Sequence, residues 1–120
     1  MKKSKKKRLR DKADNLWFKK YLKTSCEVCG QSDNVLQGHH FYFKGSYGHL
    51  RYNKENHITL CRGCHFVLHH QDPKKVEEKI IEARGKSWYN KLKKQAQKPP
   101  INYQTTIGYY EENIKELTKI

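Results

Sequence analysis

The sequence is poor in the apolar residues that build a large core or a membrane segment. Hydrophobic residues make up only 35% of its 120 residues, and the mean hydropathy is -1.09. No apolar run reaches the roughly 18 to 20 residues of a membrane span, and no apolar segment follows the basic N-terminus as a secretion signal requires. We therefore expect a small intracellular, cytoplasmic protein of one domain, without a membrane partner. Such a chain needs a bound metal or another partner to remain folded.

Acidic side chains are also scarce, at 12 Asp and Glu against 26 Lys and Arg, so the net charge is +14 and the pI is near 9.7. This excess of cations favours nucleic acid as the partner. Residues 1–8 are almost entirely basic, and their mutual repulsion predicts a disordered arm. The cations of this arm are predicted to bind phosphates without sequence preference. They are Lys2, Lys3, Lys5, Lys6, Lys7 and Arg8.

Apolar periodicity and capping residues predict helices on both sides of the centre of the chain. Apolar side chains recur at helical intervals from about Leu9 to Lys23. Asp72 followed by Pro73 is typical of an N-cap and a first helical residue, and Gly85 is typical of a helix end. A helix is therefore expected between Pro73 and Gly85.

Two more helices are predicted towards the C-terminus. Ser87 can cap one of them, and Pro99-Pro100 stops it. The other has an apolar face formed by Tyr110, Ile114 and Leu117. These boundaries divide the chain into the basic arm over residues 1–8, a central domain over residues 9–98, and a C-terminal extension with a short helix over residues 99–120.

The four cysteines form two Cys-x2-Cys pairs, Cys26 with Cys29 and Cys61 with Cys64. A tight turn of this kind lets both sulfurs of a pair reach one tetrahedral Zn²⁺, and two pairs complete a closed structural site. Disulfides and a redox-active pair are the alternatives. Both are disfavoured, because the sequence shows neither a secretion signal nor a thioredoxin-like βαβ pattern.

Two histidines stand side by side in the stretch LQGHHFYFKG. If this stretch is a strand, His39 and His40 point to opposite faces and cannot easily bind the same ion. His65 and His69 are four residues apart, which puts both rings on one face of a helix. His39 is then a third candidate ligand for a cation, and His40 is left to act as a base.

The order and spacing of these residues resemble those of the HNH nucleases, also called ββα-metal or His-Me finger nucleases, over residues 25–71. Asn56 precedes His65 by nine residues, as in the family pattern. The resemblance implies a small α+β fold in which a ββα-metal finger, stapled by a four-cysteine zinc site, is flanked by helices, with residues 9–98 as the nuclease domain. The segment GHHFYFKGSYGHLRYNKENHITLCRGCH is also similar to the phage NinG/Rap recombination nucleases, which carry an Arg shortly before the Asn.

The resemblance also implies a role for each matched residue. The catalytic residues would be His40 as general base, Asn56, which hydrogen-bonds backbone across the hairpin and holds His40 in place, and Arg51. Arg51 would clamp a phosphate through two guanidinium nitrogens, the alternative being an exposed loop arginine. The ligands of a catalytic divalent ion would be His39, His65 and, as in colicin-type DNases, His69.

The implied activity is metal-dependent hydrolysis of DNA phosphodiester bonds, which leaves 5′-phosphate and 3′-hydroxyl ends. A neutral imidazole suits the removal of a proton from water near neutral pH, because its ordinary pKa is about 6.5. Three imidazole ligands favour Zn²⁺ or Ni²⁺ as the catalytic ion, whereas Mg²⁺ is abundant and favoured by related enzymes, and Mn²⁺ is a further candidate.

Several alternatives to this interpretation stay open. Adjacent histidines are often surface or packing residues, and a zinc-stabilised module that binds DNA or RNA without catalysis would have the same composition. The DNA substrate could be duplex or branched, in phage or prophage recombination or in other DNA processing. One finger has one active site, so cleavage of both strands requires a homodimer or two successive nicks.

Overall fold

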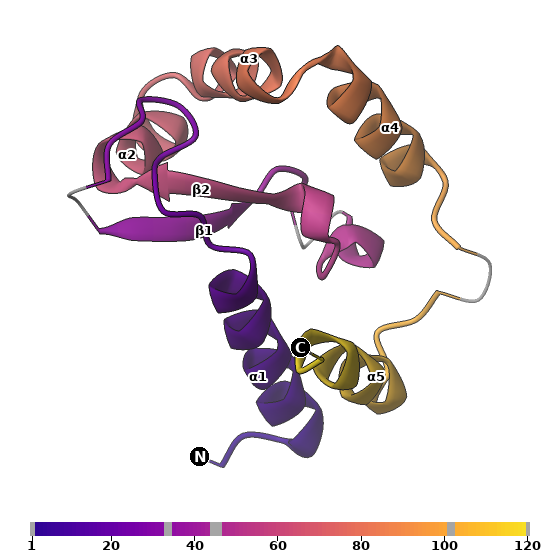
Figure 1. The fold of residues 1–120 in the computed structure, drawn as a ribbon. Coiled ribbons are helices and arrows are strands. Elements are labelled where there is room, and N and C mark those ends of the chain that lie inside the picture. Colours follow the sequence, from indigo (N-terminus) through magenta and orange to yellow (C-terminus); the bar gives the residue numbers. More distant parts are fainter. Residues whose placement is uncertain (1, 33–34, 44–46, 101–102, 120) are drawn as a thin grey trace.

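The structure, a computed structural model, describes residues 2–32, 35–43, 47–100 and 103–119. Within these residues the chain has five α-helices and one two-stranded antiparallel sheet (Figure 1), which confirms the predicted α+β class. In chain order the elements are α1 (Lys5–Lys20), β1 (Leu36–His40), the 3-10 turns η1 (Gly48–Leu50) and η2 (Lys54–Asn56), β2 (His57–Cys61), α2 (Arg62–His70), α3 (Pro73–Arg84), α4 (Lys86–Gln97) and α5 (Ile107–Leu117).

Helices cover both faces of the sheet. Strands β1 and β2 pair in the register that sets His40 opposite His57 and Leu36 opposite Cys61. Figure 1 shows α2 and α3 on one side of the sheet, and α1 with α5 on the other. Every residue of β2 is buried as a result, and the β-branched Ile58 and Thr59 suit this position.

The apolar side chains form two clusters. The larger one lies among the sheet and helices α2, α3 and α4, and its most buried members are Ile58, Leu60, Ile80 and Leu92. The smaller one joins α1 to α5 and to the connection between the strands through Ala13, Trp17, Tyr52, Tyr110 and Leu117. The C-terminal helix is therefore packed against the N-terminal one, and the predicted apolar face of α5 is the face that is buried.

Capping residues explain the boundaries of α3 and correct one prediction for α4. The Asp72 side chain accepts a hydrogen bond from the Lys75 amide, Pro73 begins α3, and Gly85 ends it, as predicted. Ser87 does not cap α4. Helix α4 already begins at Lys86, because Gly85 has a φ of 98° and turns the chain directly from one helix into the next.

The prediction of a disordered arm over residues 1–8 is wrong for residues 5–8, which belong to α1. The hydroxyl oxygen of Ser4 accepts from the Lys7 amide at 3.2 Å and caps the helix. The ammonium of Lys3 pairs with the Asp11 carboxylate at 2.8 Å. The helix also ends at Lys20, three residues before the predicted end. Met1 lies outside the described residues.

No helix in the described part of the chain is both long enough and apolar enough to cross a membrane.

Candidate active site

The four cysteine sulfurs converge between the loop after α1 and the start of α2. All four lie within 4.8 Å of one another, and the sulfurs of Cys29 and Cys61 are 3.5 Å apart. Four sulfurs that bind one zinc ion at about 2.3 Å lie about 3.8 Å apart in a tetrahedron, so the observed spacing fits. None of the four forms a disulfide. The cluster could therefore bind a structural metal ion, as predicted.

The thiols of this cluster differ in acidity. Burial raises the pKa of the Cys26 thiol, but backbone amides of Cys29, Cys61 and Val28 outweigh it and bring that pKa to about 7. Burial, followed by the neighbouring thiols, raises the pKa of Cys64. A cation among the four sulfurs would offset this crowding, because it stabilises the thiolate form of each.

Three imidazoles form a second cluster on the α2 side of the sheet. His39 comes from β1, while His65 and His69 come from successive turns of α2, and one nitrogen of each ring lies within 4.8 Å of the others. Burial, reinforced by repulsion from His69 and His65, lowers the pKa of His39 to about 3. Neutral imidazoles are the form that binds metals. His69 is exposed, so a cation held here would have one side open to solvent.

His40 lies on the other face of β1, as the alternation of a strand predicts. Its ring stacks on the indole of Trp17, with centroids 4.0 Å apart and an interplanar angle of 10°. Its Nε2 lies 2.9 Å from the carbonyl oxygen of Arg51. Because a carbonyl can only accept, Nε2 carries the proton, and the lone pair of the neutral ring is on Nδ1. This is the tautomer in which Nδ1 can take up a proton.

Asn56 is fully buried and bridges the two ends of the connection between the strands. Its Oδ1 accepts from the Tyr42 amide at 2.8 Å, and its Nδ2 donates to the carbonyls of Tyr42 and Leu50, both at 3.1 Å. The backbone hydrogen bonds that the resemblance implied are therefore present. Asn56 therefore ties the backbone of Tyr42, two residues after His40, to the backbone of Leu50.

The guanidinium of Arg51 is engaged by a carboxylate. Its Nε and Nη2 donate to the two oxygens of Asp14, at 2.7 and 2.6 Å, and the side chains are only 11% and 13% exposed. The hydrogen bond to Asp14 also raises the pKa of Arg51. Arg51 is thus not an exposed loop arginine, and its Nε–Nη2 fork could clamp a phosphate only by exchanging Asp14 for it. Its backbone carbonyl is the group that contacts His40.

Three residues that the sequence did not single out for the site lie next to these groups. They are Asp14, Trp17 and His57. The side chain of His57 is buried, and its Nε2 donates to the Phe18 carbonyl at 3.0 Å. Gly38 permits this packing, because a Cβ there would lie 2.7 Å from both His57 Nε2 and Phe18 Cδ1. The glycine before the histidine pair is the only local signal of this contact.

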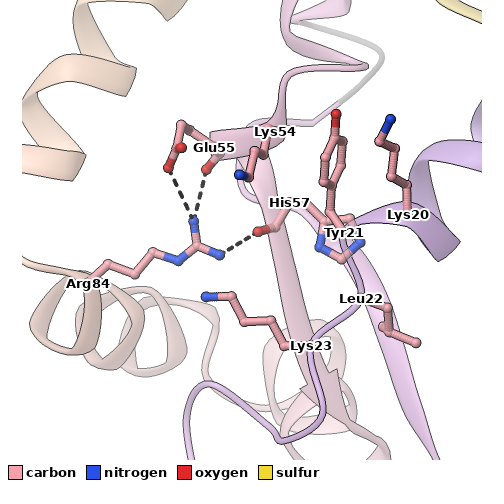
Figure 2. A pocket seen from close by; sticks show the side chains of 8 residues that line it. All are labelled: Lys20, Tyr21, Leu22, Lys23, Lys54, Glu55, His57 and Arg84. Carbon is pink, nitrogen blue, oxygen red and sulfur yellow. Dashed lines mark hydrogen bonds and ion pairs between the residues drawn. The ribbon is translucent and has the colours of Figure 1, made fainter. Parts of the chain in front are cut away.

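A hollow of about 590 Å³ lies beyond His57, between the end of α1, η2 and the end of α3. Figure 2 shows Arg84 reaching across it to the carbonyl and carboxylate of Glu55 and to the carbonyl of His57. Arg84 also pairs with Glu27 at 2.7 Å, and the ammonium of Lys23 pairs with the same carboxylate. These cations are bound to acceptors of the protein itself, so we assign the hollow a structural role.

The six basic side chains from Lys2 to Arg8 are all exposed. Lys5, Lys6 and Lys7 lie on the first turn of α1, which contains no acidic residue. The N-terminal end of a helix already carries partial positive charge from the peptide dipoles. The start of α1 is therefore a strongly cationic point of the surface.

No known family model matches the chain, and neither a curated protein nor a solved structure matches it.

Proposed function

We propose that the protein is a metal-dependent DNA endonuclease of the HNH type, which hydrolyses phosphodiester bonds to 5′-phosphate and 3′-hydroxyl ends. One observation carries the proposal. Three imidazoles converge on one face of β1, and the next residue of the strand, His40, has its Nε2 proton bound by a carbonyl. The two neighbouring histidines are thus suited to two different tasks, metal binding and proton transfer.

His40 would act as the general base. In its neutral form Nδ1 accepts the proton of the attacking water, and the ring becomes an imidazolium. The hydrogen bond from Nε2 to the Arg51 carbonyl strengthens as the ring gains positive charge, because charge-assisted hydrogen bonds are the stronger ones. The stacked Trp17 indole also favours a cation over its face. Both contacts therefore stabilise the charged form that the reaction creates.

His39, His65 and His69 would hold the catalytic divalent ion, with Mg²⁺, Mn²⁺, Ni²⁺ and Zn²⁺ as candidates. When bound, such an ion supplies Lewis acidity to the scissile phosphate and to the departing 3′ oxygen. The chain contributes three imidazole ligands and an outer side that solvent can reach, where a phosphate of the substrate would enter.

The four cysteines would hold a structural Zn²⁺ that stiffens the frame of this site. Cys61 ends β2, and Cys64 directly precedes His65 on α2. A metal at the sulfurs would therefore fix the start of the helix that carries two of the three histidine ligands. The order of β1, β2 and α2, with histidines on the first strand and on the helix, is consistent with a ββα-metal finger.

The experiment is nicking of a supercoiled plasmid in the presence of each of the four ions, by the wild type, His40→Ala and His70→Ala. His70 is the matched control, because it is an exposed histidine whose ring packs against Phe66 and which is not among the three converging imidazoles. We expect the wild type and His70→Ala to nick the plasmid and His40→Ala to be at least about 10²-fold slower. A wild type that binds DNA or RNA but cuts neither with any ion would be the non-catalytic zinc module instead.

A further inference from the structure

Helix α1 contacts the loop beside His40 through two residues on one of its faces, Asp14 and Trp17. The Oδ1 of Asp14 accepts from Arg51 Nε at 2.7 Å and from the Tyr52 hydroxyl at 2.9 Å, and its Oδ2 accepts from Arg51 Nη2 at 2.6 Å. One turn later, Trp17 Nε1 donates to the Asn53 carbonyl at 3.1 Å. Three successive loop residues are thereby tied to α1.

The same loop holds His40. The carbonyl oxygen of Arg51 accepts from His40 Nε2 at 2.9 Å, while the side chain of Arg51 is bound to Asp14. The indole of Trp17 lies flat on the His40 ring. Stacking fixes the plane of the imidazole, and the carbonyl fixes its rotation within that plane. The first restraint comes from α1 directly, and the second comes from a residue whose side chain is bound by Asp14 of α1.

We propose that Asp14 is a positioning residue for His40, acting through the Arg51 carbonyl to hold the imidazole with its proton on Nε2. This inference rests on the proposed function, because it assigns a role in the reaction of His40. Without the carboxylate, the Arg51 side chain loses its only charged partner among the described residues, and the carbonyl becomes free to shift. The His40 ring could then adopt the other tautomer or rotate, and neither state offers Nδ1 as a base.

A second ion pair of the same kind provides a matched control. Arg84 binds the Glu27 carboxylate through two nitrogens at 2.7 and 3.0 Å, and its side chain is 12% exposed against 11% for Arg51. Its remaining hydrogen bonds go to the carbonyls of Glu55 and His57. Arg51→Lys and Arg84→Lys therefore each remove a guanidinium that binds a carboxylate through two nitrogens. Only Arg51 also contacts His40.

The test compares Asp14→Asn, Arg51→Lys and Arg84→Lys with the wild type in single-turnover nicking and in long-range ¹H–¹⁵N spectra of the histidine rings. We expect Asp14→Asn and Arg51→Lys to lower the nicking rate at least about 10-fold, with DNA affinity and metal content unchanged. The His40 signals should move away from the Nε2–H tautomer in both. Arg84→Lys should lower the melting temperature but keep the wild-type rate and the wild-type His40 signals.

Wild-type rates and His40 signals in folded Asp14→Asn would overturn the proposal. If the wild type has no nuclease activity, the proposed function is wrong. The His40 spectrum of Asp14→Asn then tests by itself whether Asp14 positions the ring. If Asp14→Asn does not fold, Tyr52→Phe replaces it, because that variant removes one of three hydrogen bonds to Asp14 and leaves the ion pair. A smaller rate loss with a displaced His40 spectrum supports the role, and no change in either overturns it.

Discussion

The Nε2 atom of His40 lies 2.9 Å from the carbonyl oxygen of Arg51, a residue that the sequence suggested for its side chain. The contact assigns the proton of the neutral ring to Nε2 and its lone pair to Nδ1. On the other face of the same strand, His39 faces His65 and His69. Adjacent histidines thus have different surroundings, and the consequences can be measured separately.

The variants His39→Ala and His40→Ala should lose nicking activity for different reasons. His39→Ala removes one of three candidate ligands, so we expect weaker binding of the divalent ion and partial recovery of nicking at higher ion concentration. His40→Ala should bind ion and DNA normally, yet stay at least about 10²-fold slow at every ion concentration. Titration of nicking rate against ion concentration distinguishes the two. If His40→Ala is instead the variant that binds the ion weakly, the roles of the two histidines are exchanged. Normal nicking rates in both variants would contradict the nuclease proposal.

The low pKa of His39 predicts that stability falls in acid. Burial and the neighbouring His69 and His65 lower this pKa to about 3 in the fold, whereas the unfolded chain takes up the proton near pH 6.5. Between these values the unfolded state binds more protons, so the contribution is fully present above about pH 6.5 and is lost as pH falls. Without ion at the imidazoles, we expect His39 alone to lower the free energy of unfolding by about 2 kcal/mol between pH 7.5 and pH 5.

Urea unfolding at the two pH values, for the wild type and His39→Gln, measures this difference. Glutamine has no proton to gain, so the variant should lose less stability on acidification. Equal losses in the two proteins would show that His39 does not carry the effect.

Replacement of Cys61 should have a structural effect beyond the loss of one ligand. Its sulfur lies 3.5 Å from that of Cys29, and it also accepts a hydrogen bond from the Cys64 amide as the N-cap of α2. We expect the wild type to carry about one tightly held Zn²⁺ per chain, and Cys61→Ser to be unfolded or insoluble. Elemental analysis and circular dichroism test this. A well-folded wild type without zinc would contradict the prediction.

Asn56→Ala should be more costly than the same change at Asn53. The first variant takes the Asn56 side chain away from the part-buried amide and carbonyl of Tyr42, and leaves the Leu50 carbonyl with the Asn53 amide alone. The loss of stability should be about 3 kcal/mol. Asn53 is half-buried, and its side chain accepts from the Glu55 amide and donates to Gln95 in exposed hydrogen bonds, so Asn53→Ala should cost about 1 kcal/mol. Similar values for the two variants in urea unfolding would contradict the structural role of Asn56.

The cationic start of α1 should contribute to the salt dependence of DNA binding. Replacing Lys5, Lys6 and Lys7 by glutamine keeps the helix and removes three exposed charges. The slope of log K against log salt should become shallower by up to about 0.9 for each phosphate that the variant no longer neutralises. The matched control replaces three exposed lysines of α4, namely Lys91, Lys93 and Lys94. An equal change of slope in both variants would show that the binding is not concentrated at α1.

Local patterns in the sequence were enough to predict the parts of the site that depend on local geometry. A Cys-x2-Cys turn brings its two sulfurs together, a spacing of four puts His65 and His69 on one helical face, and strand alternation separates His39 from His40. Asp72 and Pro73 begin α3 for an equally local reason, since the cap, the first helical residue and the amide they serve lie within four residues of one another. The first turn of α1 was not predicted, because the run of like charges favoured a disordered arm over a helix capped by Ser4.

Only the tertiary structure decided which groups surround His40. Asp14 and Arg51 are 37 residues apart, and Trp17 and Asn53 are 36 apart. No periodicity relates residues at such distances, so their contacts depend on how α1 packs across the sheet. That packing depends in turn on α5, whose Tyr110 and Leu117 share a buried cluster with Ala13 and Trp17. The sequence by itself determined which side chains could bind metal, because those patterns are local. The long-range burial of apolar surface determined that α1, packed on α5, lies against His40.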